Sequence, residues 1–229
     1  MTLNTPSELS FLTQWDTPTI CNALELIVPG RRGYGFTVEQ AVCLNPGLKP
    51  IVGYARTARC ATRKPPEGNV QELADRRLAY YEYVAEAPHP TIAVVQDFET
   101  DPGAGAFWGE VQTNIHKRLG CVGTVTDGGI RDLDEMKEGG FNAFASDVLV
   151  SHGYIHIVDV NVPITVGGLT VNPGDLIVGD QHGVLEVPKE IAADLPEAVR
   201  KVEERERNII DHCNSEDFDL ETLKKLVSK

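Results

Sequence analysis

Apolar residues at helical spacing predict two short helices at the start of the chain. Thr5-Pro6-Ser7-Glu8 has the form of a capping box with proline at the first helical position, and an apolar face follows as far as Trp15. Thr17-Pro18 repeats the start signal, and Pro29-Gly30 is expected to end the second helix.

Further along, short and nearly continuous apolar runs alternate with charged stretches of helical pattern. Such runs are typical of parallel strands that are buried on both faces. The expected strands are residues 51–62, 91–97, 121–127 and 141–146, and the expected helices are 69–86, 110–119 and 130–138. This β-α-β order predicts an α/β fold, and right-handed crossovers place the loops 98–109 and 128–132 at the carboxyl edge of one parallel sheet.

The second half of the chain has shorter β runs separated by turn residues. In Asp180-Gln-His-Gly183, aspartate is expected to supply a side-chain hydrogen bond and glycine a positive φ, as in a hairpin turn. An antiparallel or mixed sheet is therefore expected over residues 154–187. Charged helices are expected at 188–205 and 217–227, where they are placed to dock on a neighbouring subunit. With no linker or repeat, residues 1–229 are expected to form one domain.

Charge and composition exclude several classes of protein. Lys and Arg number 21 against 34 Asp and Glu, which gives a formal net charge of −13, so direct nucleic-acid binding is not expected. No run of 18 apolar residues predicts a membrane span. Five dispersed cysteines without a C-x-x-C pair favour the reducing cytoplasm. Cys121 lies in an apolar strand and is expected to be inert, and His152 and His156 have no helical ligand spacing.

The helix expected after Gly109 provides a place for an anion. Its first residues, Glu110, Val111 and Gln112, have backbone N–H groups without intrahelical partners, and the positive end of the helix dipole lies there. A carboxylate group suits this position. Glu110 has two interpretations, one as a catalytic acid or base and one as a first-turn acid that favours the helix dipole.

The next loop brings Arg131 and Asp132 to the same sheet edge. The guanidinium group suits a planar carboxylate, and a single aspartate suits Mg²⁺, which keeps most of its water ligands. Glu135, three residues later, shares the face of Asp132 and is the better second carboxylate, whereas Asp134 points elsewhere. These residues predict a site for a 2-oxo acid and its metal. The structural alternative is an Asp132 that caps its own helix beside a solvated Arg131, with Glu135 on the surface.

A dinucleotide site is the weaker alternative at this edge. The glycines in Gly103-x-Gly105-x-x-x-Gly109 are spaced one residue too far apart for G-x-G-x-x-G. Asp127 nevertheless lies where an acid that binds ribose is expected, at the end of the following strand. A nucleotide-dependent oxidoreductase is therefore kept as one hypothesis.

Several of these stretches together resemble the RraA-like proteins, a family that includes divalent-metal aldolases acting on 4-hydroxy-4-methyl-2-oxoglutarate and 4-carboxy-4-hydroxy-2-oxoadipate. The resemblance covers about residues 16–188 and leaves 189–229 as a helical extension. It rests on Thr17-Pro-Thr-Ile-Cys-Asn-Ala-Leu24, Gly53-Tyr-Ala-Arg-Thr57, Phe107-Trp-Gly-Glu110, Gly123-Thr-Val-Thr-Asp-Gly-Gly-Ile-Arg-Asp132, Pro173-Gly-Asp175 and Gly179-Asp180.

The resemblance implies a swivelling β/β/α domain, assembled as a homotrimer or hexamer, with a site for Mg²⁺ or Mn²⁺ at Asp132. In this family the backbone groups matching Gly109 to Gln112 and the arginine matching Arg131 hold the pyruvate carboxylate. Glu135 matches an acid that the aldolases have three residues after the metal-binding aspartate. Glu110 stands where some aldolases have aspartate, and by that match it holds a water that protonates the enolate.

The implied activity is that of a class II pyruvate aldolase. Such an enzyme cleaves a 4-hydroxy-2-oxo dicarboxylic or tricarboxylic acid through a pyruvate enolate and also decarboxylates oxaloacetate. The alternative within the family is a non-catalytic regulator that binds ribonuclease E. Glu135 and the terminal helices favour the lyase, because the regulators resemble a shorter core.

Overall fold

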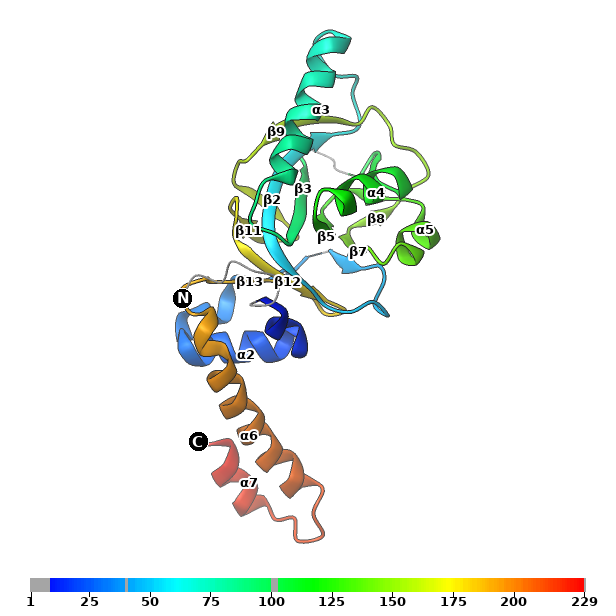
Figure 1. Cartoon of the computed structure of the whole chain (residues 1–229). Coiled ribbons are helices and arrows are strands. Elements are labelled where there is room, and N and C mark those ends of the chain that lie inside the picture. The colour runs from blue at the N-terminus through cyan, green and yellow to red at the C-terminus, as the bar shows by residue number, and fades with distance from the viewer. Residues whose placement is uncertain (1–8, 40, 100–102, 229) are drawn as a thin grey trace.

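The computed structural model describes residues 9–39, 41–99 and 103–228, and its centre is a mixed sheet (Figure 1). The strand order is β1-β7-β5-β3-β2-β12-β13, and β9 also pairs with β2. Strands β2, β3, β5 and β7 run parallel, as expected, and the remaining pairs are antiparallel. These strands are β1 (Val42–Cys43), β2 (Ile51–Ala61), β3 (Thr91–Asp97), β5 (Cys121–Thr126), β7 (Asn142–Ala145), β9 (His156–Val160), β12 (Leu176–Asp180) and β13 (Gly183–Val187).

Strand β3 shows why its sequence is an unbroken apolar run. Ile92 and Val94 pack into one hydrophobic cluster, while Ala93 and Val95 pack into another on the opposite face of the sheet. Successive side chains of a strand point to opposite faces, so a strand covered on both sides has no position for a solvated residue. The hairpin of β10 (Ile164–Val166) and β11 (Leu169–Val171) contributes to the first cluster.

A small parallel sheet that the sequence pattern did not predict joins the two loops at the carboxyl edge. It consists of β4 (Ala106–Trp108), β6 (Gly129–Ile130) and β8 (Asp147–Val148). Strands of two or three residues are too short to show an alternating pattern. After β4 and β6 come α4 (Glu110–Arg118) and α5 (Leu133–Glu138), which lie side by side (Figure 1).

Asp180 fixes the N-terminal helices to the sheet. Helix α2 (Thr17–Ile27) begins after Asp16, and Asp180 accepts hydrogen bonds from the Thr17 N–H at 2.7 Å and the Thr17 hydroxyl at 2.8 Å. The buried carboxylate also accepts the His182 N–H at 2.8 Å, and Gly183 has a φ of +135°, so the expected hairpin turn is confirmed. Short 3-10 helices flank α2 at Ser10–Gln14 and Pro29–Gly33. The predicted capping box at Thr5-Pro6-Ser7-Glu8 lies outside the described residues.

Helix α3 (Val70–Ala85) lies against β9, and its buried residues are all in its C-terminal half. Asn69 caps it, so the predicted range of 69–86 is close to the observed one. Its N-terminal half extends beyond the sheet (Figure 1).

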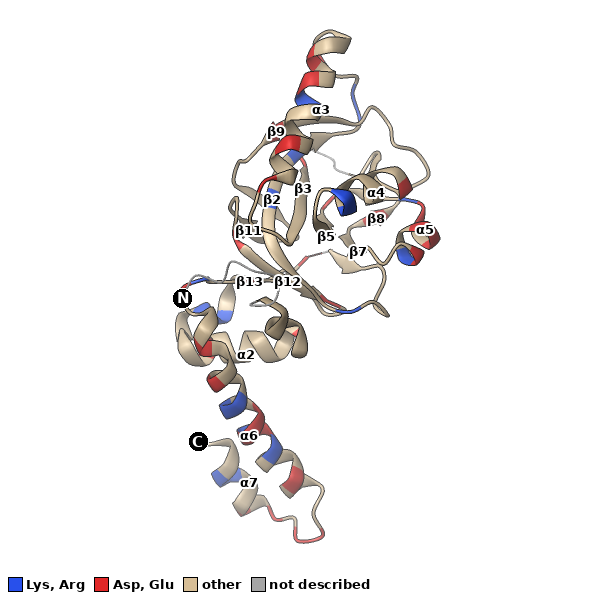
Figure 2. Cartoon of the chain, viewed as in Figure 1, with Lys and Arg blue, Asp and Glu red and all other residues tan. Residues whose placement is uncertain are grey.

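The C-terminal helices form an arm that leaves the body of the molecule (Figure 1). The predicted range of 188–205 is wrong, because α6 spans Leu195–Cys213 after a short 3-10 turn at Ala192–Asp194. Pro196, in the first turn of α6, suits a helix start better than Pro188, which directly follows β13. Helix α7 (Leu220–Val227) agrees with the expectation. Acidic and basic residues alternate along α6 (Figure 2), and no helix among the described residues is long and apolar enough to cross a membrane.

Replacing Asp180 by alanine is expected to lower the free energy of unfolding by about 2–4 kcal/mol, because the buried Thr17 N–H and hydroxyl and the partly buried His182 N–H lose their acceptor. Urea denaturation measures the change. Asp211→Ala on the exposed part of α6 is the matched control, with an expected change below about 0.5 kcal/mol. Equal losses in the two variants would show that Asp180 does not hold α2.

Candidate functional site

The two loops at the carboxyl edge are joined by the β4–β6 pairing and by a hydrogen bond at the start of α4. The Glu110 N–H, at the start of α4, donates to Asp132 Oδ2 at 3.0 Å. Asp132 precedes α5 with a left-handed backbone (φ +54°), and its side chain makes no capping bond to α5. The interpretation of Asp132 as the cap of its own helix is therefore wrong, because the carboxylate caps the neighbouring helix α4 instead.

Gly109 makes this contact possible. A Cβ atom at this position would lie 2.5 Å from Asp132 Oδ2 and 3.2 Å from Arg131 Cγ, so any larger residue would push the Asp132 carboxylate away. Gly109 is the third glycine of the motif considered for a nucleotide, and here it makes room for the Asp132 carboxylate.

Arg131 is held by its backbone and leaves its side chain accessible. Its N–H donates to the Trp108 carbonyl at 3.0 Å, across the pair formed by β4 and β6. Its Nε lies 3.7 Å from Asp132 Oδ2, and its side chain is 38% exposed. The two terminal guanidinium nitrogens have no acceptor among the described residues, so they are available to an anionic ligand.

The structure leaves fewer free donors at α4 than the sequence suggested. The Glu110 N–H is used by Asp132, whereas the Val111 and Gln112 N–H groups have no acceptor in the described part of the chain. A second carboxylate bound there would lie near that of Asp132 and be repelled by it. Binding an anion at this place therefore requires positive charge in addition to the helix dipole.

The residues at this site fit a divalent cation only if the cation keeps most of its water ligands. Within the described ranges, no three His, Cys, Asp or Glu side chains are grouped so that they could enclose a metal ion. Asp132 Oδ1 accepts no hydrogen bond from any described residue, so one hard oxygen ligand remains free. Mg²⁺ binds in this way, through one or two carboxylates and several waters.

Glu110 and Glu135 occupy equivalent places at the site. Each lies in the first turn of its helix, α4 or α5, and each side chain is exposed. Neither carboxylate has a hydrogen-bond or ion-pair partner among the residues described. Both are therefore open to solvent and to a ligand, and the roles expected for them stay predictions.

A buried histidine of α4 that the sequence did not single out links this helix to α3. His116 Nδ1 lies 2.7 Å from the Gln112 carbonyl, so Nδ1 carries the proton, and Nε2 accepts the Tyr80 hydroxyl at 2.8 Å. Burial lowers the pKa of His116 to about 4, against the raising effect of the Gln112 carbonyl. Tyr81 donates to Gln112 Oε1 at 3.1 Å. Helix α3 thus holds the first turns of α4, and a lone histidine in a helix carries no sequence signal of that role.

Asp127, which the dinucleotide interpretation assigned to ribose binding, bonds to the chain itself. Asp127 Oδ1 accepts the Asp97 N–H at 2.6 Å, and burial raises the pKa of Asp127 to about 6. Asp97 accepts the Gly103 N–H at 2.9 Å and thereby anchors the glycine-rich loop to β3. Burial also raises the pKa of Cys121 to about 11, so its thiol stays protonated and inert, as expected.

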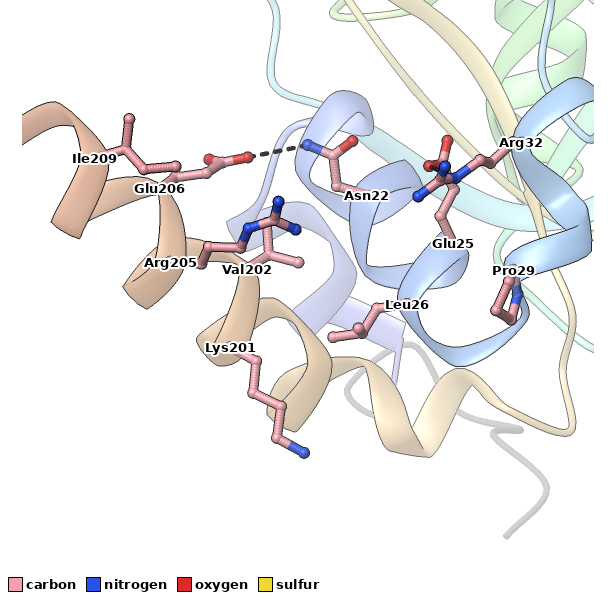
Figure 3. Close-up of a pocket in the computed structure, with 10 residues that line it drawn as sticks. All are labelled: Asn22, Glu25, Leu26, Pro29, Arg32, Lys201, Val202, Arg205, Glu206 and Ile209. Carbon is pink, nitrogen blue, oxygen red and sulfur yellow. Dashed lines mark hydrogen bonds and ion pairs between the residues drawn. The ribbon is translucent and has the colours of Figure 1, made fainter. Parts of the chain in front are cut away.

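A cavity of about 600 Å³ lies away from this site, between α2 and α6 (Figure 3). Asn22 donates to Glu206 across it at 3.2 Å, and Arg32 pairs with Glu25 at 3.2 Å. Its charged groups therefore largely satisfy one another, in contrast with Arg131.

Comparison with known proteins agrees with the motifs. The RraA-like family model, described as Aldolase/RraA, matches residues 17–185. The chain belongs to this family. The match agrees closely with the range of about 16–188 expected from the sequence.

Three proteins that are similar to this RraA-like protein match it over most of its length. A protein of Halalkalibacterium halodurans, named "Putative 4-hydroxy-4-methyl-2-oxoglutarate aldolase", is 32% identical over 212 residues, which are 90% of this chain and 91% of the relative. The crystal structure of an uncharacterized protein from Pseudomonas syringae pv. tomato has a TM-score of 0.71 at 26% identity and covers 95% of this chain and 92% of that one. Streptomyces coelicolor RraAS2, described as an unusual member of the RNase ES inhibitor RraA protein family, has a TM-score of 0.67 at 24% identity, over 87% and 94% of the two chains. The last likeness is one of fold alone, and together these structures confirm the expected α/β fold class.

The stability of this protein is expected to depend on His116 in acid. The unfolded chain takes up this proton near pH 6.5, whereas the folded chain resists it until about pH 4. The free energy of unfolding therefore falls as the pH drops from 6.5 toward 4, by about 3 kcal/mol in total from this group. His116→Gln keeps hydrogen-bonding groups but does not titrate, so urea denaturation at several pH values should show a weaker pH dependence for the variant. Parallel curves would contradict the assignment.

Proposed function

We propose that this protein is a divalent-metal-dependent lyase that cleaves a 4-hydroxy-2-oxo dicarboxylic or tricarboxylic acid to pyruvate and a second oxo acid. The observation that carries the proposal is the Asp132 carboxylate bound at the start of α4, beside the unpaired guanidinium of Arg131. The name of the Halalkalibacterium halodurans relative, an aldolase for such an acid, supports the same conclusion. Mg²⁺ or Mn²⁺ is the proposed cofactor.

Several groups of the chain bind the pyruvate half of the substrate, each at a different part of it. Arg131 and the free Val111 and Gln112 N–H groups bind the C1 carboxylate of the substrate, where Arg131 offsets the repulsion from Asp132. Asp132 would hold the divalent ion, which would supply Lewis-acid stabilisation of negative charge on the 2-oxo oxygen. Glu135 would orient water beside that ion.

A base takes the 4-hydroxyl proton, the C3–C4 bond breaks, and the electron pair of that bond passes to the pyruvate half, which becomes an enolate. The second half leaves with a new carbonyl group at the former C4. Glu110, exposed beside the helix start, holds the water that protonates C3 of the enolate. Oxaloacetate gives the same enolate when carbon dioxide leaves, so decarboxylation is expected to accompany the cleavage. We further propose that the protein works in the cytoplasm as a homotrimer or hexamer.

Asp132→Ala is expected to abolish metal-dependent pyruvate release. Chelator-stripped protein is assayed with oxaloacetate and with 4-hydroxy-4-methyl-2-oxoglutarate, with and without added Mg²⁺ or Mn²⁺, against a control that contains the metal but no enzyme. Asp134→Ala removes the same charge two residues away and should keep most of the activity, because Asp134 is exposed on α5. Metal-dependent release that survives in Asp132→Ala would place the site elsewhere.

Arg131→Lys is expected to lower kcat/KM by roughly 10- to 100-fold, because an ammonium group cannot form two parallel bonds to one carboxylate. The loss should appear with both substrates, since both contain the pyruvate half. Full activity in this variant would exclude a bidentate contact. An absence of pyruvate release from the wild-type protein would instead favour a non-catalytic, protein-binding role, which a pull-down experiment would then examine.

A further inference from the structure

The C-terminal arm, which consists of α6, α7 and the turn between them, has little of its surface covered by the rest of the chain (Figure 1). The buried side chains of α6 are all in its first two turns, and no residue from 200 to 228 is buried. Helices in proteins gain most of their stability by packing an apolar face, so an ordered arm of this kind indicates a partner that covers it. The large apolar side chains that the arm exposes are Ile210, Phe218, Leu220 and Val227.

The turn between α6 and α7, residues 214–219, combines negative charge with an exposed aromatic ring. Phe218 is 49% exposed, and its ring centroid lies 5.3 Å from that of His212. His212 Nε2 lies 2.9 Å from the Asp219 carbonyl oxygen, so the turn is held at the end of α6. Glu216 and Asp217 have no hydrogen-bond or ion-pair partner among the described residues, and the sequence has no lysine or arginine from position 208 to 223. The charge of this turn is therefore not neutralised by its own arm.

The cavity between α2 and α6 has the complementary character. Leu26, which is 52% exposed, and Val202 contribute apolar surface to it. Its basic residues are Arg32, Lys201 and Arg205. Arg32 and Lys201 have acidic partners, but Arg205 has none in the part of the chain that the structure describes, and its side chain points from α6 toward α2 (Figure 3). The cavity thus offers an unpaired guanidinium group beside apolar side chains.

The acidic turn of the same chain does not reach this cavity. Helix α6 ends at Cys213, which is about 12 Å beyond Arg205 along the helix axis, and His212 holds the turn there. A second copy in antiparallel orientation brings the turn of each chain to the cavity of the other. In parallel orientation the two acidic turns would lie side by side and repel each other.

We propose that two copies of this chain pair through their arms, with the turn 214–219 of each copy bound in the α2–α6 cavity of the other. Phe218 packs on Leu26 and Val202 of the second copy, and the Glu216–Asp217 pair faces its Arg205. The contact is reciprocal, so it closes with two copies. Two chains of net charge −13 repel each other at long range, and this local match of opposite charge and apolar surface favours one specific contact. The pairing does not depend on the proposed lyase activity.

Analytical ultracentrifugation of the full-length protein measures the pairing as the mass of the assembly. At about 50 mM salt, where screening is weak, Arg205→Glu is expected to halve this mass, because the new carboxylate repels the acidic turn of the second copy. The result should hold whatever contacts join the cores of the subunits. Arg207→Glu makes the same change of charge at an exposed position of α6 that does not line the cavity. This matched control is expected to keep the wild-type mass.

An exchange of charges separates a specific contact from a damaged arm. Glu216→Arg combined with Asp217→Arg should halve the mass in the same way, and adding Arg205→Glu to this pair should restore it, since opposite charges then meet again. Circular dichroism checks that each variant keeps its helix content. A triple variant that stays at half the mass, or an Arg205→Glu protein of wild-type mass, would overturn the proposal. A wild-type assembly of one or three chains would also overturn it and would leave the arm to a partner of another kind.

Discussion

The bond between Asp132 and the Glu110 N–H is the contact on which the site depends. It joins the loops after two neighbouring parallel strands and replaces the usual cap of α4, whose N-cap residue is the glycine at position 109. Glycine has no side chain to satisfy a helix N-terminus, so the cap has to come from elsewhere in the chain. The absence of a Cβ at Gly109 and the left-handed backbone of Asp132 bring the two groups together, and the β4-β6-β8 sheet fixes the loops in register.

This arrangement makes the electrostatics of the site unusual for an anion-binding helix start. A carboxylate of the protein already occupies the first donor of α4, so a substrate carboxylate meets repulsion as well as the helix dipole. Arg131, beside Asp132, provides part of the compensating charge. The same repulsion favours a cation at Asp132, and for that reason metal binding and substrate binding are expected to support each other.

Helix α3 supports the site through its C-terminal half. Tyr80 bonds to His116, and Tyr81 bonds to the side chain of Gln112, so two side chains of α3 hold α4. The position of the α4 donors is therefore set by helix packing and does not depend on a flexible loop.

The sequence by itself determined the features that depend on local pattern. The apolar run of β3, the β-α-β order, the Asp180–Gly183 turn and the placement of Arg131 and Asp132 at the carboxyl edge all follow from periodicity, turn chemistry and the handedness of crossovers. Only the tertiary structure decided which partner each polar group has. Asp132 caps α4 and not α5, the Glu110 N–H is occupied, and Tyr81 of α3 fixes the side chain of Gln112. These outcomes depend on contacts between residues far apart in the chain, and no local pattern of residues encodes the geometry of such a contact.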